Sequence, residues 1–332
     1  MRLLVLLGLS ACAATAAGVS ARAKALHRDS LVFDGHAHVI NRQFHDHTDI
    51  GDALPRGQFD LPRAREGGLG AFFFSLYIAE EYYPGRYETK QVLRLYDLAT
   101  TQLEKNKQTI EMALNATDIE RIRRAGKIAG VLDLEGGFDL DGDLGVLRTL
   151  HRLGFRSLQL SAHNWTNQFA DSCCAPPKSK GLTEHGRAVI REMNRLGMVI
   201  NISHAADTTI EQALAVSTDP LVATHHGMRA LNDIPRTMPD ALMKKVAAKG
   251  GVIGFHMGNE FHNRKMFDWR TKYEGKAFWD TSKVRGKVAG LSIFEIDKLT
   301  GPHFPDEGVP APKDLLFTVD GWIAVIDRAI QV

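Results

Sequence analysis

The sequence predicts an α/β protein with the architecture of a (β/α)8, TIM-like barrel. Short apolar segments alternate with amphipathic helical segments, and several helical segments end in glycine just before the next apolar segment. Apolar runs of four to eight residues are typical of parallel strands buried on both faces. Seven such strands favour a barrel, with an open doubly wound sheet as the alternative.

The predicted strands are short and regularly interrupted by helices. They cover residues 31–34, 71–78, 127–134, 155–160, 198–202, 221–224 and 252–255. Helices are expected at 92–112, 144–153, 189–196, 207–214 and 239–247, with Gly154, Gly197 and Gly250 ending three of them. The last segment, 319–332, has a helical pattern and occupies the place of an eighth strand. Because an unclosed barrel leaves unpaired strand edges, we expect the gene product to continue beyond Val332.

The N-terminal 25 residues have the pattern of an export signal. Arg2 precedes the apolar run 3–9, and small residues continue to Ala21. This apolar run is too short to span a membrane. The segment ending at Cys12 resembles a bacterial lipobox, in which the cysteine is lipidated; an ordinary cleaved signal is the alternative. We expect an exported protein, either periplasmic or anchored in the membrane, whose residues 26–332 form one barrel that is incomplete at the C-terminus.

The composition excludes several classes of protein. Lys and Arg total 41 against 39 Asp and Glu, so the chain lacks the large positive net charge that favours binding of nucleic acid. Three cysteines are too few for a disulfide scaffold. Two of them, Cys173 and Cys174, are adjacent; a disulfide between them, pairing elsewhere, metal binding and free thiols all stay open.

Polar side chains cluster where the predicted strands end, which is where βα barrels build their active sites. The segments are Asp34-Gly35-His36-Ala37-His38, Asp133-Leu134-Glu135-Gly136-Gly137, Ser161-Ala162-His163-Asn164, Ser203-His204, His225-His226 and His256. His36 and His38 share one side of an extended strand and can bind one ion together. A buried carboxylate such as Glu135 is costly unless a cation lies beside it, and its two oxygens can bridge two ions. His256 alone could equally be a packed or rim residue.

These segments carry a resemblance to the renal (membrane) dipeptidase family of zinc peptidases. The matching stretches are Phe33-Asp34-Gly35-His36, Leu134-Glu135-Gly136-Gly137, His163-Asn164, Ile202-Ser203-His204, and His225 followed by Arg236-Thr237-Met238-Pro239-Asp240. Their order and spacing fit from about residue 30 onward.

The resemblance implies two zinc ions in a distorted TIM barrel and an enzyme that hydrolyses dipeptides. His36 and His38 would bind one zinc, Glu135 would bridge, and His204 and His225 would bind the other. A hydroxide between the ions would attack the peptide bond. The two remaining assignments concern the substrate: His163 would orient the scissile carbonyl, and Arg236 would pair with the C-terminal carboxylate. Dipeptides with a C-terminal D-residue and a homodimeric assembly are further implications.

The chain departs from the family pattern at three points. His38 stands where the family often has Asp, which removes one negative charge. His226 follows His225, and the spacing to Arg236 favours His225 as the ligand. The family's proton-shuttling Asp at the end of the eighth strand has no counterpart before Val332.

Two other functions stay open. An amidohydrolase-type enzyme acting on lactones or non-peptide amides would use the same His36-x-His38 pair but would not need Arg236. If the chain ends at residue 332, a catalytically inactive barrel used for binding is the other alternative.

Overall fold

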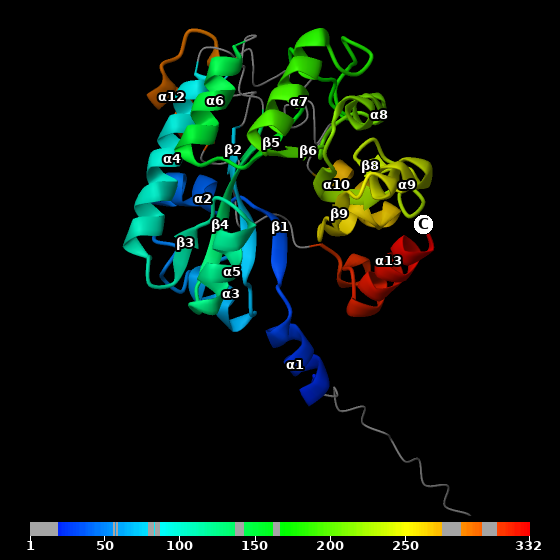
Figure 1. Ribbon diagram of the computed structural model, residues 1–332. Coiled ribbons are helices and arrows are strands. Elements are labelled where there is room, and N and C mark those ends of the chain that lie inside the picture. The colour runs from blue at the N-terminus through cyan, green and yellow to red at the C-terminus, as the bar shows by residue number, and fades with distance from the viewer. Residues whose placement is uncertain are drawn as a thin grey trace, which may run out of the picture.

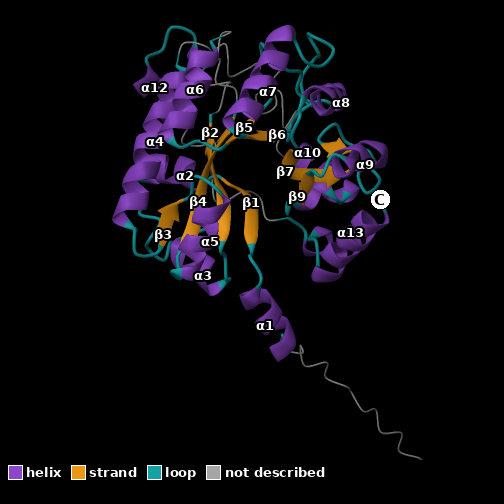
Figure 2. Ribbon diagram, in the orientation of Figure 1, coloured by secondary structure: helices purple, strands orange, loops and turns teal. Residues whose placement is uncertain are grey.

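Parallel strands form one sheet that curls into a half-barrel, with helices along its outer side (Figures 1 and 2). The computed structural model describes residues 19–55, 57, 59–78, 83, 87–136, 143–161, 167–273, 287–300 and 311–332. Every pairing between the strands it describes is parallel. The predicted fold class, α/β with a TIM-like barrel, is confirmed.

The elements alternate along the chain as expected for βα units. The strands are β1 (Phe33–Ala37), β2 (Ala71–Tyr77), β3 (Ile110–Met112), β4 (Ile128–Glu135), β5 (Ser157–Gln159), β6 (Val199–Asn201), β7 (Leu221–Met228), β8 (Thr237–Met238) and β9 (Val252–Phe255). The helices are α1 (Ala21–Asp29), α2 (Val39–Asp46), α3 (Leu61–Glu66), α4 (Glu88–Lys105), α5 (Ala116–Arg124), α6 (Leu144–Leu153), α7 (Glu184–Leu196), α8 (Asp207–Val216), α9 (Asp240–Ala248), α10 (Arg264–Tyr273), α12 (Ile293–Thr300) and α13 (Val319–Gln331). Short 3-10 turns lie at Asn259–Phe261 and Lys313–Leu315.

Seven of these strands match the predicted ones, and their order in the sheet is β1-β2-β4-β5-β6-β7, with β9 also paired to β7. The short strands β3 and β8 are additions. β3 pairs with the first half of β4, and β5 pairs with its second half. β8 pairs with the end of β7. The described residues contain no strand after β9.

The predicted helix at 92–112 is wrong at its C-terminal end, because α4 stops at Lys105. Asn106 ends the helix, and its side-chain amide donates to Asp49 Oδ1 and to the Gln102 carbonyl. The chain then turns, and Ile110 pairs with Ile128 as the first residue of β3. Ile110 is fully buried, so the apolar residues that extended the helical pattern belong to the sheet.

Glycine ends three helices at the predicted positions. Gly154, Gly197 and Gly250 have φ angles of 108°, 68° and 77°, in the left-handed region that glycine adopts without steric cost. The chain therefore reverses sharply after α6, α7 and α9 and enters the next strand.

The two sides of the half-barrel come close together at β7. A Cβ atom built on Gly35 of β1 would lie 2.5 Å from the carbonyl oxygen of Thr224, and one on Gly254 of β9 would lie 2.4 Å from the same oxygen. Only glycine allows such an approach. The curl therefore brings β1 next to β7.

The N-terminal segment is described from residue 19 onward. Ser20 caps α1, whose helix extends away from the barrel (Figure 1). The division at residue 25 and the role of Cys12 stay predictions, and residues 1–18 lie outside the described part. No helix in the described ranges is both long and apolar enough to cross a bilayer.

Candidate metal centre

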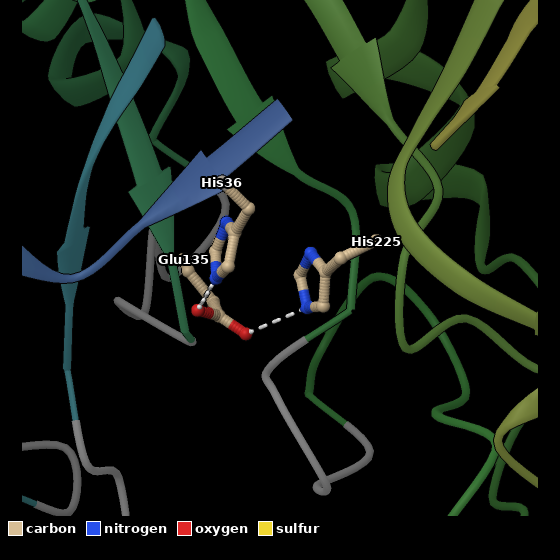
Figure 3. Close-up of side chains that lie close together, drawn as sticks. All are labelled: His36, Glu135 and His225. Atoms are coloured by element: carbon tan, nitrogen blue, oxygen red, sulfur yellow. Dashed lines mark ion pairs between the residues drawn. The ribbon is translucent and has the colours of Figure 1, made fainter. Parts of the chain in front are cut away.

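All five predicted metal ligands lie together at the carboxyl ends of the strands. His36 comes from β1, and His38 follows that strand directly. Glu135 is the last residue of β4, His204 lies in the turn after β6, and His225 belongs to β7. Figure 3 shows the rings of His36 and His225 side by side, each facing a different oxygen of the Glu135 carboxylate. The curl of the sheet thus brings together residues from the N-terminal and C-terminal parts of the chain.

The two oxygens of Glu135 face two different pairs of histidines. Oε2 lies 2.7 Å from His36 Nε2 and also contacts His38 Nε2. Oε1 lies 3.0 Å from His204 Nε2 and 3.4 Å from His225 Nε2. The carboxylate therefore stands between the β1 pair and the β6–β7 pair, as a ligand shared by two ions would.

The donor set fits divalent zinc. Ligand atoms of His36, Glu135 and His225 all lie within 4.8 Å of one another. Tetrahedral zinc with bonds of about 2.0–2.1 Å separates its ligand atoms by roughly 3.3 Å. The distances from the Glu135 oxygens to His36 Nε2 and His225 Nε2, 2.7 Å and 3.4 Å, are close to this value. Imidazole nitrogens with one carboxylate suit zinc better than calcium or magnesium, which prefer oxygen ligands.

His204 reaches the site from a left-handed backbone. Its φ angle is 61°, a conformation that residues with a side chain adopt at a cost. The ring is buried and faces both Glu135 and His225. The backbone strain therefore coincides with the position of a candidate ligand.

The electrostatics favour an ionised Glu135 beside a neutral His225. Burial alone would raise the pKa of Glu135, but His36, His38, His225 and His204 together hold it well below its usual range. The pKa of His225 is well below its ordinary value, mainly because of burial and then because of His36. At His36, burial acts to lower the pKa, but the nearby Glu135 outweighs it and the pKa is raised. An anionic carboxylate and a neutral imidazole are the forms that bind metal ions.

A second layer of polar groups holds two of the candidate ligands. Ser75 Oγ of β2 lies 3.0 Å from His36 Nδ1 and donates to Asp133 Oδ2 at 2.7 Å. On the other side, Thr224 Oγ1 lies 2.9 Å from His225 Nδ1. No role of these side chains behind the ligands was predicted from the sequence. One signal was available for Asp133: it precedes Glu135 by two residues, so both share one face of β4.

Arg236 is a buried cation beside this centre. It is 2% exposed, and its Nη2 donates to the His225 carbonyl at 2.9 Å. Its Nε and Nη1 are buried without a hydrogen-bond partner among the described residues, and Phe261 packs against the guanidinium. Burial lowers its pKa to about 9, although Glu135 acts in the opposite direction. Buried, unsatisfied donors of this kind suit an anionic ligand.

The other histidines named from the sequence have different positions. His226 is buried, and its neighbour His225 is the one that faces Glu135. His256 stacks on Phe261, and burial followed by the charge of Arg236 lowers its pKa to about 3. His163 lies outside the described residues, so its predicted role stays a prediction. Cys173 and Cys174 form a disulfide with each other.

Comparison with known proteins identifies related sequences. A family model described as membrane dipeptidase (peptidase family M19) matches residues 20–294. The dipeptidase tcpJ of Claviceps purpurea is 33% identical over 205 residues, which cover 59% of this chain and 48% of that protein. The dipeptidase aclJ of Aspergillus oryzae is 30% identical over 234 residues, covering 68% and 54%. The chain thus spans about half the length of the curated relatives it matches.

Solved structures share the fold. The probable dipeptidase PvdM from Pseudomonas aeruginosa aligns with a TM-score of 0.73 and 22% identity, over 93% of this chain and 82% of that one. A metallopeptidase from Rhodobacter sphaeroides, bound to a phosphinate mimic of the dipeptide L-Ala-D-Ala, aligns with a TM-score of 0.62 and 20% identity, over 90% and 99%. Because the family model covers most of the sequence, this chain belongs to the membrane dipeptidase family, peptidase family M19.

Proposed function

We propose that this protein is an exported dipeptidase that uses two zinc ions. The family is one of metal-dependent peptidases. The observation that carries the proposal is the position of Glu135, whose oxygens each face a separate pair of histidines. His36 and His38 would hold one ion, and His204 and His225 the other. Bound there, the ions would activate water for attack on a peptide carbonyl and stabilise the charge that develops.

Arg236 would anchor the substrate. A free carboxylate could accept from Nη1 or from Nε, the two donors without a partner among the described residues, while Nη2 stays on the His225 carbonyl. Because that carbonyl belongs to a candidate ligand, the anchored carboxylate would lie close to the ions. A short distance between the anchored carboxylate and the ions suits a substrate whose scissile bond is next to its C-terminal residue, as in a dipeptide. His163 would orient the scissile carbonyl.

We further propose that the site accepts a C-terminal D-residue. The support is one neighbour of the same fold, which is bound to a mimic of L-Ala-D-Ala. Hydrolysis rates of L-Ala-D-Ala and L-Ala-L-Ala by the purified protein test this point. A rate for the D-form below one hundredth of that for the L-form would contradict it.

The central experiment removes and restores the metal. We expect chelation to abolish dipeptide hydrolysis and two equivalents of Zn²⁺ per chain to restore it. Full hydrolysis by demonstrably metal-free protein would overturn the proposal.

Arg236→Ala separates the dipeptidase from a lactone or non-peptide amide hydrolase. In a dipeptidase it raises KM at least tenfold for dipeptides, because a charge-assisted hydrogen bond to the substrate carboxylate is lost. A hydrolase without a carboxylate anchor would keep its activity. Arg156→Lys, at a half-buried arginine bonded to the Leu114 carbonyl away from the centre, is the matched control.

Export and lipidation of Cys12 remain part of the proposal. Their support is the N-terminal sequence pattern alone. Mass spectrometry of the N-terminal peptide from the producing cell distinguishes a lipidated Cys12 from an ordinary signal cleavage.

A further inference from the structure

A second buried carboxylate lies behind the candidate metal centre. Asp133 is fully buried on β4, two residues before Glu135. Among the described residues, the ionisable nitrogen that lies within 4 Å of it is His36 Nδ1, 3.9 Å from Oδ2. No lysine or arginine in the described ranges forms an ion pair with it. Burying a carboxylate without a cationic partner is expensive, so its presence calls for a function.

Ser75 connects this carboxylate to His36. The Ser75 hydroxyl has one hydrogen, and its best acceptor is Asp133 Oδ2 at 2.7 Å; the alternative, the Phe73 carbonyl, is 3.4 Å away. With that hydrogen committed to Asp133 Oδ2, Ser75 Oγ can only accept from His36 Nδ1, 3.0 Å away. The proton of a neutral His36 is thereby held on Nδ1. The lone pair of Nε2 then points at Glu135 Oε2 and the candidate ion.

We propose that Asp133, acting through Ser75, is a positioning residue that fixes the tautomer of His36 and strengthens binding of the ion held by His36 and His38. This inference rests on the proposed two-ion site. Groups that bond the far nitrogen of a metal-bound histidine orient the ring and increase its basicity.

The arrangement behind His225 is electrically different. His225 Nδ1 faces the Thr224 hydroxyl at 2.9 Å, and that hydroxyl is also close to the side chains of Asn201 and Ser203. All of these groups are neutral. The ion on the β1 side would therefore feel, behind His36, a negative charge that the groups described behind His225 do not provide. Asp133 would supply a negative charge near this ion, which His38 does not supply where the family often has Asp.

The test measures zinc affinity in Asp133→Asn and Ser75→Ala. Asn keeps the size of Asp133 and can still accept from Ser75, so it removes the charge alone. Ser75→Ala removes the connection. In competition titrations with a chromophoric chelator, we expect each variant to bind one of its two zinc ions about 10–100-fold more weakly than the wild type. Thr224→Val, which removes the neutral hydroxyl behind His225, is the matched comparison and should spare the ion on the β1 side.

Thermal unfolding of the metal-free proteins separates positioning from a structural role. Asp133 is fully buried and has no lysine or arginine partner among the described residues, so a carboxylate there costs the fold free energy. Metal-free Asp133→Asn should therefore unfold at the same or a higher temperature than the wild type, while its zinc-induced rise in Tm becomes smaller. Asp60→Asn, at a buried helix cap paired with Arg63, should lower Tm and leave zinc affinity unchanged.

A double variant assigns the effect to one ion. Once His38→Ala has removed a ligand from the β1-side ion, Asp133→Asn should weaken zinc binding little further, because both changes act on the same ion. Long-range proton–nitrogen NMR spectra of the histidine rings should show the His36 proton on Nδ1 in the wild type and a shifted tautomer population in Ser75→Ala.

The outcomes are distinguishable. If the wild type binds two zinc ions and Asp133→Asn binds both with unchanged affinity, the inference fails and the proposed function stands. A fall in the Tm of metal-free Asp133→Asn would assign the residue a folding role and also overturn the inference. Absence of zinc binding by the wild type would instead overturn the proposed function.

Discussion

At the scale of single residues, the candidate centre concentrates features that local folding preferences disfavour. His204 has a left-handed backbone, and Arg236 and Glu135 are charged groups removed from water. Each of these costs the fold free energy, and each has a use at a site that binds cations and an anion. Strain and buried charge therefore point to the same place as the motif pattern.

The backbone cost of His204 can be measured by comparing His204→Gly with His204→Ala. Both variants lose the imidazole, but only glycine is free of the left-handed penalty at φ 61°. Metal-free His204→Gly should therefore be more stable than His204→Ala, by about 1 kcal/mol, in urea unfolding. Equal stabilities, or a more stable alanine variant, would show that the backbone there is unstrained. Neither variant should bind the full complement of zinc.

At the scale of elements, helix packing around the sheet relies on apolar stripes supported by a few ion pairs. On α7, Val189, Ile190 and Met193 are fully buried. Glu192 of the same helix bonds Arg195 and also reaches Arg148 on α6. These two arginines, Arg195 first, lower the pKa of Glu192 from 4.5 to about 2. One carboxylate thus joins two neighbouring helices.

Glu192→Gln should reveal this link as a pH-dependent loss of stability. A carboxyl group whose pKa is lowered on folding stabilises the fold above its unfolded pKa, and this contribution disappears as the pH falls through the folded value. Because both arginines are largely exposed, we expect a loss of about 1 kcal/mol at pH 7. The difference should shrink below pH 4.5 and vanish near pH 2.

Chemical denaturation of wild type and variant across this pH range is the measurement. Glu120→Gln, which breaks an exposed pair with Arg124, should show a much smaller effect. A constant difference between pH 7 and pH 2 would contradict the assignment.

How far the sequence predicts the structure also depends on the element. Buried strands and glycine-ended helices were predictable, because apolar runs and a left-handed Gly154 or Gly197 are local signals. The end of α4 was not, since Ile110 continues a helical spacing and only its pairing with Ile128 makes it a strand residue. The histidines and Glu135 were visible as a set at strand ends. Ser75 was not, because its role depends on β1 and β4 lying on either side of β2.

At the scale of the whole molecule, the curl of the sheet assembles the centre. β1 provides His36 and β7 provides His225, and their rings stack with centroids 3.7 Å apart. The strands can come this close only where Gly35 faces the Thr224 carbonyl. The curl of the half-barrel therefore determines the geometry of the candidate site.

Gly35→Ala tests this dependence. The added methyl group would meet a backbone oxygen at 2.5 Å, which cannot rotate away as a side chain would. We expect a destabilisation of about 1–3 kcal/mol and weaker zinc binding, because β1 must move away from β7. Gly67→Ala, where the nearest atom is at 3.3 Å, is the control and should change both quantities little. Unchanged zinc affinity in Gly35→Ala would show that zinc binding does not depend on the close approach of β1 to β7.

The contact between Gly35 and Thr224 also has a kinetic consequence. It closes a loop of about 190 residues. The chain entropy lost on closing this loop raises the free energy before the contacts at the junction can lower it. This junction should consequently form late in folding, after the neighbouring βα units have docked. An interaction absent from the transition state slows unfolding and leaves the folding rate nearly unchanged. Ions bound between β1 and β7 should then extend the lifetime of the native state far more than they accelerate its formation.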